Sequence, residues 1–136
     1  MRCIAGTHLI VDGYVSDKLY FSQESVFSLF DSLVSTLQMT YLTTPVACEV
    51  PVSPELLDSE EDEGGTSFYA QITTSHLALH AWPLRRAFMF DVFSCRNFDA
   101  NAALSILLDS LHVEEYHHQI ITRTDPKEVN SVKNLH

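Results

Sequence analysis

The side chains best suited to chemistry lie in one stretch of the sequence, between Ser67 and Cys95. Polar groups in strands that are otherwise apolar need hydrogen-bond partners or a function. Hydroxyl, imidazole and thiol groups in one region favour nucleophilic or acid–base chemistry. The reactive residues of this stretch are Ser67, Thr73, Thr74, Ser75, His76, His80 and Cys95.

A metal site is the first interpretation to test, because His76 and His80 would share one face of a helix. The threonines before them and Pro83 after them favour a strand, in which the two histidines stand roughly 13 Å apart at about 3.3 Å per residue. One ion cannot bridge that distance. His117 and His118 would point to opposite faces of a strand. We therefore expect no metal site.

A thiolate–imidazole pair of Cys95 and His80 is a second interpretation, since neighbouring strands could bring the two together. A cysteine and a histidine in a core are more often plain packing, so the pair alone carries little weight. Pyridoxal phosphate (PLP) chemistry needs a lysine in the site. We expect no PLP, because the three lysines fall in turns or in the C-terminal tail: Lys18, Lys127 and Lys133.

The charge of the chain limits its partners. Its 136 residues include 8 Lys and Arg against 18 Asp and Glu, a formal net charge of −10. An acidic chain without a basic stripe repels a phosphate backbone, so we expect no nucleic-acid partner and a cationic small molecule instead. Three cysteines without a secretory segment indicate reduced thiols and a cytoplasmic location. No apolar run approaches the ~20 residues of a membrane span, so no membrane partner is expected.

The pattern of apolar residues predicts one domain over residues 1–124 and a loose tail over 125–136. Two helices are predicted, with Ser22 and Asp99 as their N-caps. The fold class is therefore α+β, a two-layer sandwich of an antiparallel sheet with two helices on one face. Strands are expected over residues 7–11 (stopped by Asp12-Gly13), 67–73, 76–82, 88–94 and 116–122, with a weaker β-prone run over 40–52.

Residues 54–65 form an expected exposed loop. Six carboxylates occur there without a basic residue, and the segment ends in Gly64-Gly65. Charge this dense and of one sign cannot be buried, and the glycines add flexibility.

The string TSHLALHAWP, from Thr74 to Pro83, resembles the self-processing motif ESHLTIHTWPE of prokaryotic S-adenosylmethionine decarboxylases. The resemblance continues to Cys95, where the family has an apolar strand ending in DxFTC. Gly6-Thr7-His8-Leu9 is similar to the family's opening GxHL. The resemblance to the family covers most of the chain from Gly6 to about Leu111 and is weakest between residues 40 and 66.

The resemblance implies a zymogen of polyamine biosynthesis that makes its own cofactor. The Ser75 hydroxyl would attack the carbonyl of Thr74, and cleavage between the two would convert Ser75 into a pyruvoyl group. Ser67 and His80 match the family residues that assist processing. The ketone would form a Schiff base with the substrate amine. Cys95 matches the family's proton donor.

Three departures from the family motif concern the cleavage site and the substrate. Thr74 replaces the usual Glu, a change that we expect cleavage to survive. Leu84 replaces the Glu that would hold the ribose hydroxyls, and leucine cannot accept those hydrogen bonds. The acidic run around Glu61 stands where the family places an aromatic for the adenine ring. A carboxylate-rich loop suits a guanidinium or ammonium group.

We therefore expect L-arginine or L-ornithine as the substrate, with Glu61, Leu84 and Trp82 as candidate substrate-binding residues. S-adenosylmethionine remains an alternative, because it is also a cation. An unprocessed, non-enzymatic regulatory homologue is another, and a Cys95 hydrolase is a third. A solvated acidic loop without a role is as good an interpretation of residues 55–63 as a substrate-binding one. The family also implies a homodimer with active sites near the subunit interface.

Overall fold

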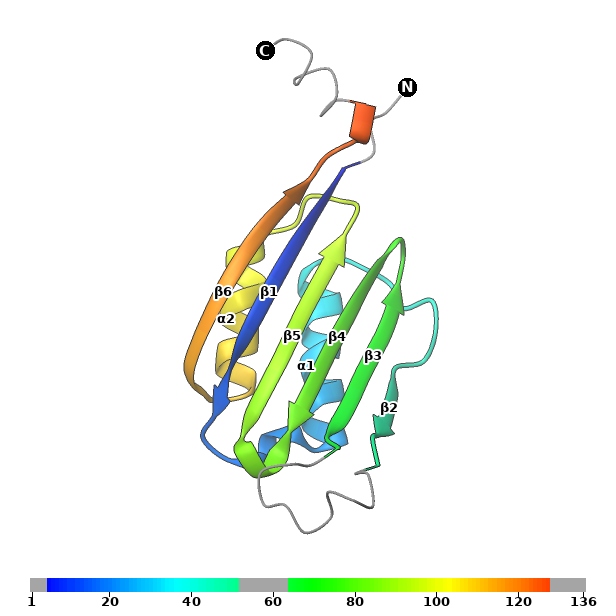
Figure 1. Cartoon of the computed structure of the whole chain (residues 1–136). Coiled ribbons are helices and arrows are strands. Elements are labelled where there is room, and N and C mark those ends of the chain that lie inside the picture. The colour runs from blue at the N-terminus through cyan, green and yellow to red at the C-terminus, as the bar shows by residue number, and fades with distance from the viewer. Residues whose placement is uncertain (1–4, 52–63, 128–136) are drawn as a thin grey trace.

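A computed structural model describes residues 5–51 and 64–127 of the chain. Six antiparallel strands form one sheet in the order β2-β3-β4-β5-β1-β6, and two helices cover one of its faces (Figure 1). The predicted two-layer α+β fold is confirmed. The strands are β1 (Gly6–Val15), β2 (Val46–Glu49), β3 (Thr66–Ile72), β4 (Ser75–Trp82), β5 (Ala87–Ser94) and β6 (Val113–Arg123). The α-helices are α1 (Gln23–Thr36) and α2 (Ala100–Ser110), and short 3₁₀ turns span Lys18–Phe21 and Pro83–Arg85.

Alternation along the central strands separates a helix-covered face from an open face. On β4, Leu77 and Leu79 are fully buried, whereas His80 between them and the strand end is exposed. Successive side chains of a strand point to opposite faces, so the buried residues must all lie under the helices. The two histidines of β4, His76 and His80, are thereby placed on the open face, whereas Ser75 shares the parity of the buried residues.

Both predicted N-caps begin a helix. The Oγ of Ser22 accepts a hydrogen bond of 3.1 Å from the N–H of Ser25, and Asp99 Oδ1 accepts one of 3.0 Å from the N–H of Ala102. These bonds satisfy backbone donors that the first turn leaves unpaired. The helix starts were therefore readable from the sequence.

The first strand is longer than predicted. β1 continues through Asp12 and Gly13 to Val15 and pairs with both β5 and β6. A Cβ at Gly13 would lie only 2.4 Å from the carbonyl oxygen of Glu115. The glycine therefore permits a close approach of neighbouring backbones and does not end the strand. Of the β-prone run over residues 40–52, only Val46–Glu49 forms a strand.

A two-residue turn joins β3 to β4. Ile72 pairs with Ser75, so Thr73 and Thr74 make the turn. Thr73 was predicted to belong to the strand, and this prediction is wrong. Thr74 adopts a φ of 52°, in the left-handed region that non-glycine residues rarely occupy. The peptide before Ser75 is therefore held in a strained turn.

Candidate functional site

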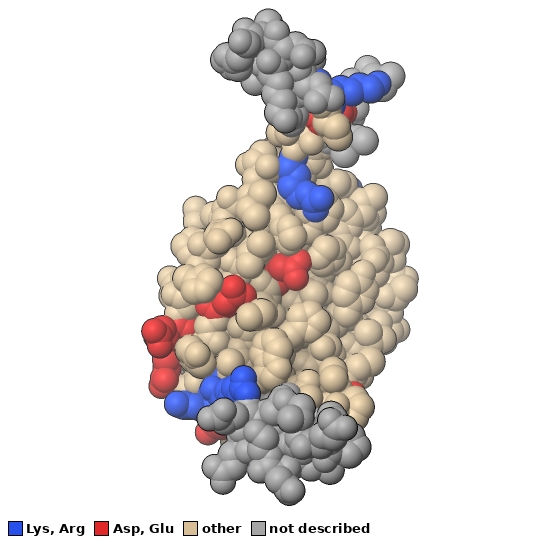
Figure 2. Space-filling view, viewed as in Figure 1, with Lys and Arg blue, Asp and Glu red and all other residues tan. Residues whose placement is uncertain are grey.

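The open face of the sheet has two ends with different chemistry. Figure 2 shows this face as mostly uncharged, with carboxylates over its middle and lower left. β4 crosses the face from Ser75 to Trp82, about 23 Å at roughly 3.3 Å per residue. The residues around Ser75 and the residues around Trp82 are therefore too far apart to form one site within the chain.

The turn at the Ser75 end brings together a hydroxyl, a strained peptide and a thiol. Ser75 is 3% exposed, and its Oγ donates a hydrogen bond of 3.1 Å to the carbonyl oxygen of Thr73. The Oγ1 of Thr74 lies 2.7 Å from the Sγ of Cys95. Ser75 and Cys95, which the sequence predicts as nucleophile and thiol, thus both contact residues of this turn.

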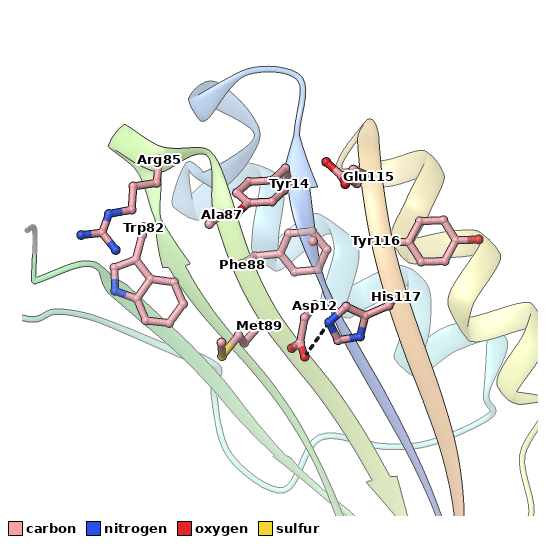
Figure 3. Close-up of a pocket in the computed structure, with 11 residues that line it drawn as sticks. Asp12, Tyr14, Trp82, Arg85, Ala87, Phe88, Met89, Glu115, Tyr116 and His117 are labelled. Atoms are coloured by element: carbon pink, nitrogen blue, oxygen red, sulfur yellow. Dashed lines mark ion pairs between the residues drawn. The ribbon is translucent and has the colours of Figure 1, made fainter. Parts of the chain in front are cut away.

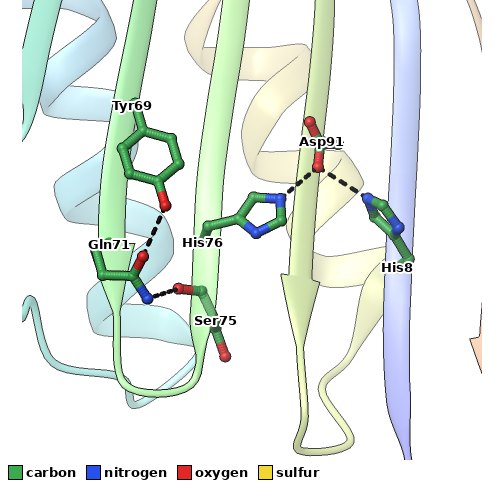
Figure 4. Close-up of polar contacts among 6 residues, drawn as sticks. All are labelled: His8, Tyr69, Gln71, Ser75, His76 and Asp91. Carbon is green, nitrogen blue, oxygen red and sulfur yellow. Dashed lines mark hydrogen bonds and ion pairs between the residues drawn. The ribbon is translucent and has the colours of Figure 1, made fainter.

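Gln71 joins the two strands of this hairpin. Its amide Nε2 donates to the carbonyl oxygens of Ile72 (3.1 Å) and Ser75 (3.0 Å), as Figure 4 shows for Ser75. The hydroxyl of Tyr69 donates to Gln71 Oε1 at 2.7 Å and fixes the orientation of the amide. Gln71 was not among the site residues predicted from the sequence. A polar residue among the apolar residues of β3 was the available signal.

Ser67 and His80 form a second pair, nearer the other end of the face. Ser67 Oγ and His80 Nδ1 lie 2.8 Å apart on paired positions of β3 and β4. A hydroxyl beside an imidazole can exchange a proton with it. The residues that resemble processing assistants are thus in contact with each other.

Within one chain, His80 does not lie beside Ser75 and Cys95. His80 follows Ser75 by five residues, about 16 Å along the strand. Ser75 shares the parity of the buried residues, whereas His80 is on the open face. Cys95 contacts Thr74 and not His80, so the Cys95–His80 pair does not form in the chain. The five-residue spacing between Ser75 and His80 on β4 places their side chains on opposite faces of the sheet.

A cavity of about 790 Å³ opens beside the Ser67–His80 pair (Figure 3). Met89 lines it and pairs in register with both His80 and Asp12, so the cavity borders the pair. Its wall includes two carboxylates and several aromatic residues, and also the basic residue Arg85. The lining residues are Asp12, Gly13, Tyr14, Trp82, Arg85, Ala87, Phe88, Met89, Glu115, Tyr116 and His117.

The candidate substrate residues have different positions. Trp82 lines the cavity. Leu84, in the turn after β4, is 67% exposed and does not line it. Glu61 and the rest of the acidic run lie outside the described residues, as do Cys3 and residues 128–136 of the predicted tail. Gly65, the second residue after the acidic run, lies against Trp82.

A third polar group occupies the middle of the open face. Asp91 Oδ2 lies 2.8 Å from the Nε2 atoms of both His8 and His76 (Figure 4). Burial opposes ionisation of this carboxyl, but the hydrogen bonds from His76 and His8 outweigh it and lower the pKa of Asp91 below its ordinary value. Asp91 is therefore a carboxylate at neutral pH. Its charge within an apolar strand was a signal that sequence analysis did not use.

No helix among the described residues is long and apolar enough to cross a membrane.

Solved structures include one of the same fold. The adenosylmethionine decarboxylase from Aquifex aeolicus superposes with a TM-score of 0.69 at 18% identity, over 90% of this chain and 92% of that one. At this identity the likeness establishes the fold.

Comparison of sequences identifies relatives and a family in addition to the fold. The S-adenosylmethionine decarboxylase proenzyme of Archaeoglobus fulgidus is 23% identical over 122 residues, 88% of this chain and 98% of that protein. The arginine decarboxylase proenzyme of Aeropyrum pernix is 33% identical over 69 residues, about half of each chain. The family model described as S-adenosylmethionine decarboxylase matches residues 7–124. This match spans the sheet, both helices and the three polar clusters around Ser75, His80 and Asp91. It confirms the expectation of an enzyme of the decarboxylase class. The chain belongs to the S-adenosylmethionine decarboxylase family.

Proposed function

We propose that the chain is a proenzyme that cleaves itself between Thr74 and Ser75 and then decarboxylates a basic amino acid. The observation that supports this most strongly is the β3–β4 turn. A non-glycine residue with positive φ precedes a buried serine, and a thiol touches the same residue. Strain at the Thr74–Ser75 peptide lowers the cost of rearranging it.

Processing would follow from attack by Ser75 Oγ on the carbonyl carbon of Thr74. The peptide C–N bond breaks as the ester forms, and the freed nitrogen takes the serine proton. β-Elimination then releases the Thr74 carboxylate and leaves dehydroalanine at position 75. Hydrolysis of dehydroalanine releases ammonia and leaves a pyruvoyl group.

The surroundings of Ser75 fit a pyruvoyl group. The backbone at position 75 pairs with Ile72 and Ser94, so the new chain end would stay within the sheet. Gln71 holds the carbonyl oxygen of residue 75 through its amide. When formed, the group supplies an electron sink for the loss of CO2. Cys95 is within reach of the same position and would return a proton to the substrate carbon.

Ser67 and His80 would act on the Ser75 of a second copy. They lie too far from the Ser75 of their own chain, and on the other face of β4. Two copies related by a two-fold axis, with open faces in contact and strands antiparallel, would place the Ser75 end of one against the His80 end of the other. The open face also exposes apolar side chains suited to such an interface: Tyr69, Met89 and Ile121. The proposed enzyme is therefore a homodimer with composite sites.

The cavity beside His80 would hold the distal group of the substrate. Asp12 and Glu115 contribute two carboxylates to its wall against the one guanidinium of Arg85, and Trp82 and Tyr14 contribute aromatic faces. Carboxylates and aromatic rings together attract a guanidinium or ammonium group. L-Arginine is the first candidate and L-ornithine the second, and the likeness to an arginine decarboxylase proenzyme supports this order.

Leu84 adds a separate argument about the substrate. It provides no acceptor for ribose hydroxyls, which disfavours S-adenosylmethionine. S-adenosylmethionine decarboxylation remains the alternative, because the relative matched over most of its length carries that name.

Intact mass spectrometry of the denatured protein tests the proposal. We expect two chains that divide between Thr74 and Ser75, with a C-terminal chain that resists Edman degradation. CO2 release from arginine, ornithine and S-adenosylmethionine then identifies the substrate. A single species of full-length mass that persists for days would contradict the proposal and favour a regulatory homologue.

A further inference from the structure

The open face carries three potential metal ligands that the proposed reaction does not use. His8, His76 and Asp91 lie on the adjacent strands β1, β4 and β5 (Figure 4). His8 and His76 are both opposite Phe93 in the register, and Asp91 is two residues along the central strand. All three side chains therefore project from the same face of the sheet.

The ligand atoms of these residues converge. The Nε2 of His8, the Nε2 of His76 and a carboxylate oxygen of Asp91 lie within 4.8 Å of one another. Each Nε2 is 2.8 Å from the same oxygen of Asp91. A tetrahedral ion with bonds of about 2.0–2.2 Å holds its ligand atoms roughly 3.3–3.6 Å apart. Small side-chain rotations supply the difference.

The neighbouring rings hold the two histidines in place. His8 packs edge-on against Phe93 with ring centroids 5.7 Å apart, and His76 stacks on Tyr69 at 6.1 Å. The two imidazole planes lie at 86° to each other, so the rings do not stack and both can turn an edge toward one point. Sites built on strands with packed ligands are more precise than sites on loops.

The cluster is partly open to solvent. In the single chain, side-chain exposure is 20% for His8, 32% for His76 and 27% for Asp91, so an ion could reach the ligand atoms before the proposed pairing of two open faces. An ion at this point would replace the contacts between the two Nε2 atoms and the carboxylate oxygen.

We propose that His8, His76 and Asp91 bind one divalent transition-metal ion. Zn²⁺ is the ion whose ligand preferences match these three side chains best. Two imidazoles and one carboxylate form a donor set that such ions prefer over Mg²⁺ or Ca²⁺, which favour oxygen ligands. The site is distinct from Ser75, Cys95 and the Ser67–His80 pair. It does not require that the chain be processed.

Metal binding by the full chain tests this inference. The protein is stripped with a chelator, and Zn²⁺ binding is followed by titration calorimetry, with Co²⁺ as a spectroscopic probe. We expect one ion per chain and visible Co²⁺ bands of a four-coordinate site. His8→Ala, His76→Ala and Asp91→Asn should each weaken binding by more than the about 10–100-fold that loss of an outer-shell partner costs.

Two control variants separate this site from adventitious binding. His118→Ala removes an exposed histidine of β6, and Cys48→Ser removes an exposed thiol; both should leave the affinity and the stoichiometry unchanged. Equal loss in His118→Ala and His76→Ala, or Zn²⁺ binding that survives all three ligand variants, overturns the inference. Circular dichroism of each variant verifies its fold. The uncut Ser75→Ala chain should bind Zn²⁺ like the wild type, so failure of processing and failure of the metal site are distinguishable.

Discussion

The side-chain amide of Gln71 donates a hydrogen bond of 3.0 Å to the carbonyl oxygen of Ser75, across the turn at which we propose that the chain cuts itself. The same nitrogen also donates to the carbonyl oxygen of Ile72. After cleavage, this amide would link the two new chains where their covalent connection is lost. Gln71 is thus a positioning residue in the proposed reaction.

Gln71→Ala should slow processing by about 3- to 10-fold, since a neutral hydrogen bond contributes about 0.5–1.5 kcal/mol. The rate is measured by the appearance of the C-terminal chain on denaturing gels. Tyr69→Phe removes only the hydroxyl that orients the amide and should have a smaller effect. An unchanged rate in Gln71→Ala would show that the backbone pairing alone holds the turn.

Ser75→Ala and His80→Ala should each give inactive protein, but their mixture should regain activity. In a mixed dimer, the intact Ser75 of one chain faces the intact His80 of the other. Random pairing makes half of the dimers mixed, each with one intact site of two, so about a quarter of wild-type sites should return. Co-expression followed by measurement of cleavage and CO2 release gives this fraction. No recovery in co-purified mixed dimers would place both residues in the same chain's site.

Leu84→Glu should move the preference toward S-adenosylmethionine. The new carboxylate can accept hydrogen bonds from ribose hydroxyls, which leucine cannot. Competition between arginine and S-adenosylmethionine, measured as the ratio of kcat/KM values, should shift by at least about tenfold for a charge-assisted pair. Leu84→Gln serves as the uncharged control. An unchanged ratio would mean that residue 84 is not near the substrate.

The Tyr41 hydroxyl donates a hydrogen bond of 2.7 Å to Asp31. Because of this contact, the free energy of unfolding should decrease at alkaline pH. Burial, then the hydrogen bond to Asp31 and its negative charge, raise the pKa of Tyr41 above its ordinary value. A raised folded-state pKa gives stability that is present below the unfolded pKa of about 10 and is lost as pH rises above it. Denaturant unfolding of the wild type should therefore lose more stability above this pH than Tyr41→Phe does. Parallel curves for the two proteins would contradict the expectation.

Large parts of the fold were predictable because local patterns determine them. Ser22 and Asp99 marked the helix starts through hydrogen bonds that involve only residues three positions away. Alternation in β4 and β5 identified the core strands, since one face of each is buried. Gly13 was misjudged because its role depends on the approach of β6, which lies about a hundred residues further along the chain.

The sequence by itself determined the reactive set: a serine after a turn, a histidine five residues later on the same strand, and a cysteine at the end of the next strand. Its motif spacing also indicated the family. Only the tertiary structure decided which of these residues meet. Strand parity sends Ser75 and His80 to opposite faces, while the pairing of β3, β4 and β5 brings Thr74 to Cys95 and Ser67 to His80. The contact of His8 with Asp91 arises because β1 lies beside β5, a neighbour relation that spacing along the chain does not contain.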